Sequence, residues 1–69
     1  MNIEWIDGFK LCVGCDGHSV TLSANGEGLL SLAKQLVALA GEAPGAHIHY
    51  DKYNALEDDS IELIIERID

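Results

Sequence analysis

The sequence predicts an α+β fold of order ββαββ, a four-stranded antiparallel sheet with one helix packed on one face. Three observations indicate this fold class. Two runs in which apolar and polar residues alternate flank an Asp-Gly pair. A segment whose apolar residues recur at the period of a helix follows them, and two further alternating runs end the chain. With 69 residues, the chain is expected to form one small domain over residues 1–69 with a limited core.

The segment FKLCVGCDGHSVTL predicts a β-hairpin, because Asp16-Gly17 suits a type I′ turn in which both central residues have positive φ. A two-residue turn at this position also fixes the register. The predicted cross-strand pairs are Cys15 with His18, Val13 with Val20, Leu11 with Leu22, and Phe9 with Ala24. These residues make one mostly apolar face, and the small polar residues, Thr21 among them, make the other.

Residues 26–40 are expected to form a helix that lies on the apolar face of the sheet. Ser23 or Asn25 can cap its N-terminus, and Gly41 and Pro44 can end it. Apolar residues recur at helical spacing and are expected to face the sheet. They are Leu29, Leu32, Ala33, Leu36, Val37 and Ala40, with Leu30 and Leu39 widening the stripe.

Two strands are expected after Pro44. In AHIHY, residues 46–50, alternation puts His47 and His49 on one side and the apolar residues on the other. The polar loop DKYNALEDD follows, and then the β-branched segment SIELIIERI. Because this last segment has apolar residues on both sides, it is expected at the centre of the sheet or in contact with another molecule.

The composition favours a protein partner over a nucleic acid. Twelve Asp and Glu against four Lys and Arg give a net charge of −8, which repels phosphate backbones and can attract a basic protein. The same acidity is also an ordinary means of keeping a protein soluble, and the sequence favours this simpler interpretation of the charge. No secretion signal opens the chain, and its longest mostly apolar segment contains Lys34 and Gln35 and is too short for a bilayer. A cytoplasmic location without a membrane partner is therefore expected.

The stretch HIHYD raises the question of a metal site, because His47 and His49 share one face of a strand. The possible third ligands are Asp51, Glu62 and Glu66. In the competing interpretation the two histidines lie on the uncovered sheet face and supply hydrogen bonds and contact area. The sequence favours this second interpretation and predicts no cofactor, while a small metal-binding regulator using His47, His49 and Asp51 is the alternative.

Other ligand and catalytic patterns are incomplete. Cys12, Cys15 and His18 have spacings found in zinc sites, but residues three apart on a strand point to opposite faces. A buried Cys15 and an exposed Cys12, both reduced, are expected instead. The calcium-like spacing of residues 51–62 lacks the required oxygen ligands and glycine, and neither a catalytic triad nor a phosphate-binding glycine pattern is present. An enzyme is not expected.

Four motifs carry a resemblance to a known family: GLLSLA at 28–33, PGAHIH at 44–49, YNALE at 53–57 and ELIIE at 62–66. Together they make residues 18–68 resemble the immunity protein 32 family of bacterial polymorphic toxin systems. The resemblance implies an inhibitor of a cognate toxin, and it supplies no catalytic or metal-binding residue. The first ten residues and CVGC match no pattern of that family.

These observations lead to one main hypothesis, that the uncovered sheet face and the acidic loop bind a cognate toxin and block its substrate site. The residues assigned to this surface are His47, His49, Thr21, Asp51, Glu57, Asp58, Asp59 and Glu62. A homodimer joined through the same sheet face or the last strand, with Ile64 in the contact, is compatible with either function.

Overall fold

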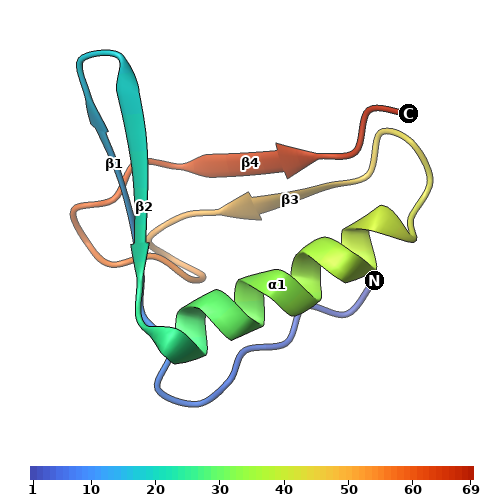
Figure 1. The fold of residues 1–69 in the computed structure, drawn as a ribbon, viewed down its shortest axis with the longest axis horizontal. Coiled ribbons are helices and arrows are strands. Elements are labelled where there is room, and N and C mark those ends of the chain that lie inside the picture. The colour runs from blue at the N-terminus through green and yellow to red at the C-terminus, as the bar shows by residue number, and fades with distance from the viewer.

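The computed structural model describes residues 1–69 and confirms the α+β class and the ββαββ order. Its elements are β1 (Leu11–Asp16), β2 (Ser19–Ala24), α1 (Gly26–Ala40), β3 (His47–Tyr50) and β4 (Leu63–Glu66). The predicted four-stranded sheet is wrong, because β1 pairs with β2 and β3 with β4 in two separate antiparallel sheets. Figure 1 shows the two sheets running in different directions, with α1 below both in this view.

An irregular segment, residues 57–61, lies along the edge of β1 and bonds to it. The amide of Glu57 donates to Leu11 O at 2.8 Å, and that of Ile61 donates to Val13 O at 2.9 Å. Val13 N donates in turn to Ser60 Oγ at 3.0 Å. A side-chain hydroxyl thus replaces one backbone partner, so the segment satisfies β1 without forming a regular ladder. β4 begins only after this segment, and the sheet is interrupted there.

The register of the first hairpin differs from the predicted one. Val13 pairs with Leu22, two residues beyond its predicted partner, and the turn is Gly17-His18. Only the first of these central residues has positive φ, 64° at Gly17, as a type II′ turn requires. A type I′ turn at Asp16-Gly17 would force Asp16 into the left-handed region as well. Because the shift is by an even number of residues, the predicted sorting of side chains into two faces is kept.

Helix α1 has the predicted bounds and is capped by Asn25, whose Oδ1 accepts from Gly28 N at 2.8 Å. The same oxygen accepts from Lys10 N at 2.9 Å, and Asn25 Nδ2 donates to Gly8 O at 2.8 Å. The cap therefore also fastens the N-terminal segment to the start of the helix.

The face that α1 turns to the core is not the predicted apolar stripe. The buried helix residues are Gly28, Ser31, Gln35 and Leu39. Within the predicted stripe only Leu32 and Leu39 are at least partly buried, whereas Leu29, Leu30, Leu36 and Val37 are 41–75% exposed. The helix is thus rotated so that a largely polar face points inward.

The N-terminal segment, residues 1–10, accounts for this rotation. It forms no strand, so its backbone groups need partners, and two polar side chains of α1 supply them. Ser31 Oγ accepts from Ile6 N at 2.8 Å, and Gln35 Nε2 donates to Glu4 O at 2.8 Å. Gln35 Oε1 also accepts from Tyr50 Oη at 2.8 Å. Every buried polar side-chain atom finds a hydrogen-bond partner, so the polar face is tolerated inside.

The core is small and combines both sheets with the helix. Its buried apolar residues are Leu11, Val13, Leu39, Ile48, Tyr50 and Leu56. Trp5 stacks on Phe9 with ring centroids 4.2 Å apart and meets Tyr50 edge-on at 6.0 Å. Nine of 69 residues are buried, and the molecule is flat, with extents of 31 × 30 × 19 Å. The helix is too short and too polar to span a membrane.

Candidate partner-binding surface

The outer side of the β3–β4 sheet carries the two histidines of HIHYD. Along β3, His47 and His49 are exposed while Ile48 and Tyr50 are buried, which is the predicted alternation. Across the strands, His47 lies opposite Glu66 and His49 opposite Ile64. We call this outer side the histidine face; its residues are His47, His49, Glu62, Ile64 and Glu66.

Short-range contacts order the histidine face. His49 Nδ1 lies 3.2 Å from Glu62 Oε2, with both side chains about half exposed. His47 Nδ1 lies 3.1 Å from Gly45 O, and since a carbonyl only accepts, this contact places a proton on Nδ1. The two imidazole rings meet edge to face with centroids 4.9 Å apart. The rings are thus held in defined positions with water-accessible edges, as a contact surface requires.

The predicted alternative, a metal held by His47, His49 and Asp51, does not agree with the geometry. The Asp51 carboxylate accepts hydrogen bonds from Tyr53 N at 2.9 Å and Asn54 N at 3.1 Å, and so forms the turn that follows β3. No three His, Cys, Asp or Glu side chains come together as a metal site. Asp51 therefore shapes the loop instead of completing a ligand set.

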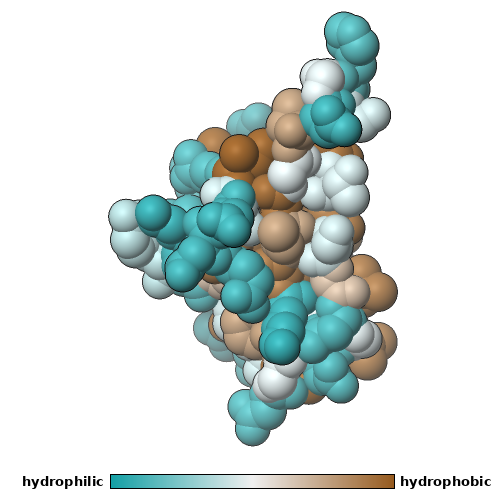
Figure 2. All heavy atoms as spheres, turned by 90° about the vertical axis from the view of Figure 1, so that its left-hand side faces the viewer, coloured by the Kyte–Doolittle hydropathy of each residue, from teal (hydrophilic) through white to brown (hydrophobic).

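The acidic loop, residues 51–59, is anchored firmly although its charged tip is exposed. Leu56 is buried in the core, and Asp51 O accepts from the amides of Asn54, Ala55 and Leu56. The bonds from residues 57–61 to β1 hold the other side. The loop is therefore fixed at both ends, and the acidic side chains that it exposes are those of Glu57, Asp58 and Asp59. Figure 2 shows the molecule from the side where this loop lies, the left-hand side of Figure 1. A broad hydrophilic area lies there beside apolar atoms.

Thr21 is exposed but lies on β2 opposite Gly14, in the other sheet. The structure therefore does not place it on a sheet face shared with His47 and His49. The earlier grouping depended on a continuous four-stranded sheet, which the irregular segment 57–61 interrupts.

Two exposed apolar residues beside the predicted site were not assigned to it. Ile64, expected only in a homodimer contact, is 51% exposed in the middle of the histidine face. Tyr53 is 86% exposed on the loop, with Lys52 Nζ 5.3 Å from its ring centroid. Tyrosine is one of the residues that contribute most to the binding energy of protein interfaces. The signals in the sequence are the second apolar side of β4 and an aromatic residue within a polar loop.

The cysteine predictions need correction. Cys15 is exposed and Cys12 is half-buried, the reverse of the predicted order, and both are free thiols. The end of the hairpin extends away from α1, as Figure 1 shows, so nothing covers the face that carries Cys15. Its cross-strand neighbour Val20 is accordingly 63% exposed.

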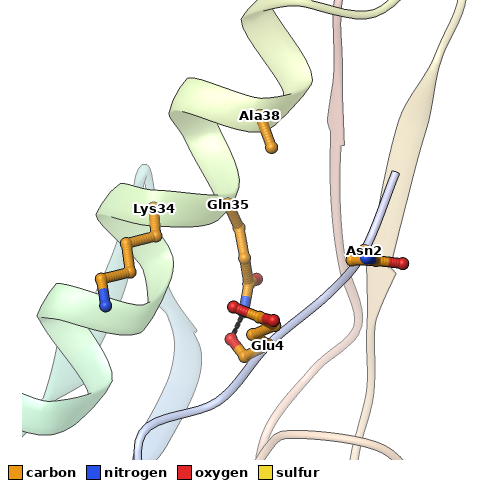
Figure 3. Close-up of a pocket in the computed structure, with 5 residues that line it drawn as sticks. All are labelled: Asn2, Glu4, Lys34, Gln35 and Ala38. Atoms are coloured by element: carbon orange, nitrogen blue, oxygen red, sulfur yellow. Dashed lines mark hydrogen bonds between the residues drawn. The ribbon is translucent and has the colours of Figure 1, made fainter.

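The hollow that Figure 3 shows, about 280 Å³, lies between α1 and the N-terminal segment. It is lined by Asn2, Glu4, Lys34, Gln35 and Ala38. Gln35 points from the helix to Glu4 and is bonded to its carbonyl, so the central polar group of the hollow is already used. The hydrogen bond in this hollow therefore supports the fold. The residues that line the hollow form no assembled catalytic group.

A family model described as Immunity protein 32 matches residues 19–68, a range that includes β2, α1, β3, β4 and the whole acidic loop. The first 18 residues, with β1 and both cysteines, lie outside the match. No curated protein and no solved structure matches the chain.

Proposed function

Because the chain belongs to the immunity protein 32 family, we propose that it binds a cognate bacterial toxin and neutralises it by protein–protein contact. The contact surface in this proposal consists of the histidine face and the acidic loop. Both lie within the residues that match the family. The protein acts as a binder in this proposal, and the toxin is blocked because its substrate site is covered.

The concentration of charge on this side of the chain is the main support. Residues 51–66 hold six acidic residues and Lys52, a net charge of −5 out of −8 for the whole chain. Such a surface attracts a basic partner and accelerates encounter with it, most strongly at low ionic strength. A toxin whose substrate site is basic would therefore meet this side of the molecule first.

The shape and chemistry of the histidine face also suit a protein contact. Ile64 stands at its centre with His49 opposite, and Glu62 and Glu66 flank it along the strand direction. An apolar centre within a polar rim is the usual arrangement of a specific interface. The imidazoles can donate and accept hydrogen bonds, so they add specificity to the contact.

Co-expression with the product of the adjacent gene tests the proposal, with survival and co-purification as readouts. The informative variant is Asp58→Lys/Asp59→Lys, which reverses two exposed loop charges. The matched control is Asp7→Lys/Asp16→Lys, which changes net charge equally at two exposed positions outside the loop. The loop variant should lose protection and associate at least about tenfold more slowly at low salt, while the control keeps both properties.

A second pair of variants tests the histidine face. His47→Ala/His49→Ala removes two exposed rings without opening the core and should weaken toxin binding. His18→Ala removes an exposed ring at the hairpin turn and should leave binding unchanged. If the loop and histidine variants both protect as well as the unmodified chain, the assigned surface is wrong.

A further inference from the structure

Helix α1 exposes its most apolar side to solvent. We call this side the helix stripe; its residues are Leu29, Leu30, Ala33, Leu36, Val37 and Ala40, all exposed. Val37 is 75% and Leu30 59% exposed, although a helix on a small domain normally buries such residues. Contiguous apolar surface of this kind marks an interaction site on soluble proteins.

The chain exposes more surface than a compact monomer of its mass, and this excess is an upper limit for the area that a partner covers. The accessible surface is 4747 Å² for a mass of 7.5 kDa. A compact monomer of that mass is expected to expose ~4,250 Å², so this chain exposes an excess of roughly 500 Å². If two copies each bury that excess, the interface totals about 1,000 Å², which reaches the lower limit for a specific association.

The charge distribution favours a second copy of this chain as the partner that binds the helix stripe. Within α1 the only charged residues are Glu27 and Lys34, which cancel, so the whole net charge of −8 lies outside the helix. Another copy of this chain carries the same −8 and is repelled by the acidic loop. The uncharged helix stripe is where two copies approach with least repulsion, whereas a basic toxin is drawn to residues 51–66.

We propose that two copies of this chain form a dimer through the helix stripe, with the two α1 helices antiparallel about a twofold axis at Ala33. In this arrangement Leu29 of one copy lies opposite Val37 of the other, and Leu30 lies opposite Leu36. The stripe is thus complementary to itself, as a twofold interface requires. The small side chain of Ala33 lets the helix axes approach to about 8–10 Å, the usual packing distance.

This dimer differs from the one expected from sequence, which used the outer sheet face or β4 with Ile64 in the contact. The Tyr50–Gln35 hydrogen bond joins the inner sides of β3 and α1, so the histidine face and the helix stripe point away from the shared core. Dimerisation through α1 therefore leaves the histidine face open.

Sedimentation equilibrium of the full chain over a wide concentration range tests the proposal, together with circular dichroism to verify folding. The unmodified chain should show twice the 7.5 kDa mass of one copy. Ala33→Arg and Ala33→Glu each bring two like charges, one from each copy, together at the twofold axis. Both variants should therefore give folded monomers. An equimolar mixture of the two should recover the dimer, because the charges on the axis are then opposite.

Two further variants make the result specific. Val37→Lys changes a residue that is 75% exposed and should also give a monomer. This variant tests the same interface if the Ala33 variants fail to fold. Val20→Arg changes an exposed valine on β2 and should leave the dimer intact.

A concentration-independent monomer for the unmodified chain, or dimers that persist in both Ala33 variants, would overturn the proposal. Loss of toxin protection in a Val37→Lys chain, with the unmodified chain monomeric, would instead assign the helix stripe to the toxin. In the proposed arrangement the folded Ala33→Arg monomer still binds toxin through the acidic loop.

Discussion

The hydrogen bond between Tyr50 and Gln35 offers a direct test of the inward polar face of α1. Tyr50 is 1% and Gln35 2% exposed, and Tyr50 Oη donates to Gln35 Oε1 at 2.8 Å. Tyr50→Phe removes the donor and leaves a buried amide oxygen without a partner. Such a loss costs about 1–3 kcal/mol, so the unfolding equilibrium constant should rise roughly 5- to 150-fold.

The matched control is Tyr53→Phe, the same chemical change at a residue that is 86% exposed. It should change the free energy of unfolding by less than about 0.5 kcal/mol. Urea unfolding followed by the fluorescence of Trp5, the only tryptophan, measures both variants. Because Trp5 packs edge-on against Tyr50, its signal reports the region under study. All chains should carry Ala33→Arg, so that association does not contribute to the measured stability.

A double-mutant cycle completes the test. Gln35→Leu alone leaves the Tyr50 hydroxyl without its acceptor, and the double variant with Tyr50→Phe removes both groups of this hydrogen bond. Both chains with Gln35→Leu also lose the donor to Glu4 O, so that loss cancels in the cycle. The double variant should therefore be more stable than the sum of the single effects predicts, by about 1 kcal/mol or more. Equal effects of Tyr50→Phe and Tyr53→Phe, or simple additivity in the cycle, would show that α1 does not turn Gln35 to the core.

Three further predictions concern pH, close packing and the loop anchor. Burial raises the pKa of Tyr50 above 10.0, so the folded state favours the neutral form of this side chain. The resulting contribution to stability is complete below pH 10 and is lost as the pH rises through the pKa of the folded state. Urea midpoints should therefore fall above pH 10, and less so in Tyr50→Phe. Gly28→Ala should destabilise by about 1–3 kcal/mol despite the better helix propensity of Ala, because its Cβ would lie 2.5 Å from Lys10 O; Gly26→Ala, in open space, should not lower the melting temperature. Leu56→Ala should cost about 2–5 kcal/mol and increase hydrogen exchange at Glu57, whereas unchanged exchange would mean that Leu56 does not anchor the loop.

Local patterns predicted the elements well because each pattern is decided within a few residues. The alternation of His47 to Tyr50 and the Asn25 cap both appear as expected. The hairpin register depended on which residue of the Asp16-Gly17-His18 run takes positive φ. Since only Gly17 does so, the turn moved one residue along the chain while every face stayed the same.

The orientation of α1 could not be obtained from its own sequence. Apolar spacing indicated that Leu29, Leu36 and Val37 face the core, but the side that packs inward is decided by groups far away in the chain. The free backbone groups of Glu4 and Ile6 require polar partners, and Ser31 and Gln35 provide them. The four-stranded sheet was wrong for a similar reason, because residues 57–61 satisfy β1 before β4 begins.

The unexpected orientation of α1 connects the two proposals. With Ser31 and Gln35 facing inward, the apolar residues of the helix are left outside, and the chain exposes more surface than its mass requires. The acidic side, residues 51–66, and the helix stripe then differ in the partner that each favours, since the first carries −5 of the net charge of −8 and the stripe carries none. A basic toxin gains electrostatic attraction at the loop, and a second acidic copy avoids repulsion at the helix. One interface can therefore be removed by Ala33→Arg and the other by Asp58→Lys/Asp59→Lys, so each can be measured with the other still present.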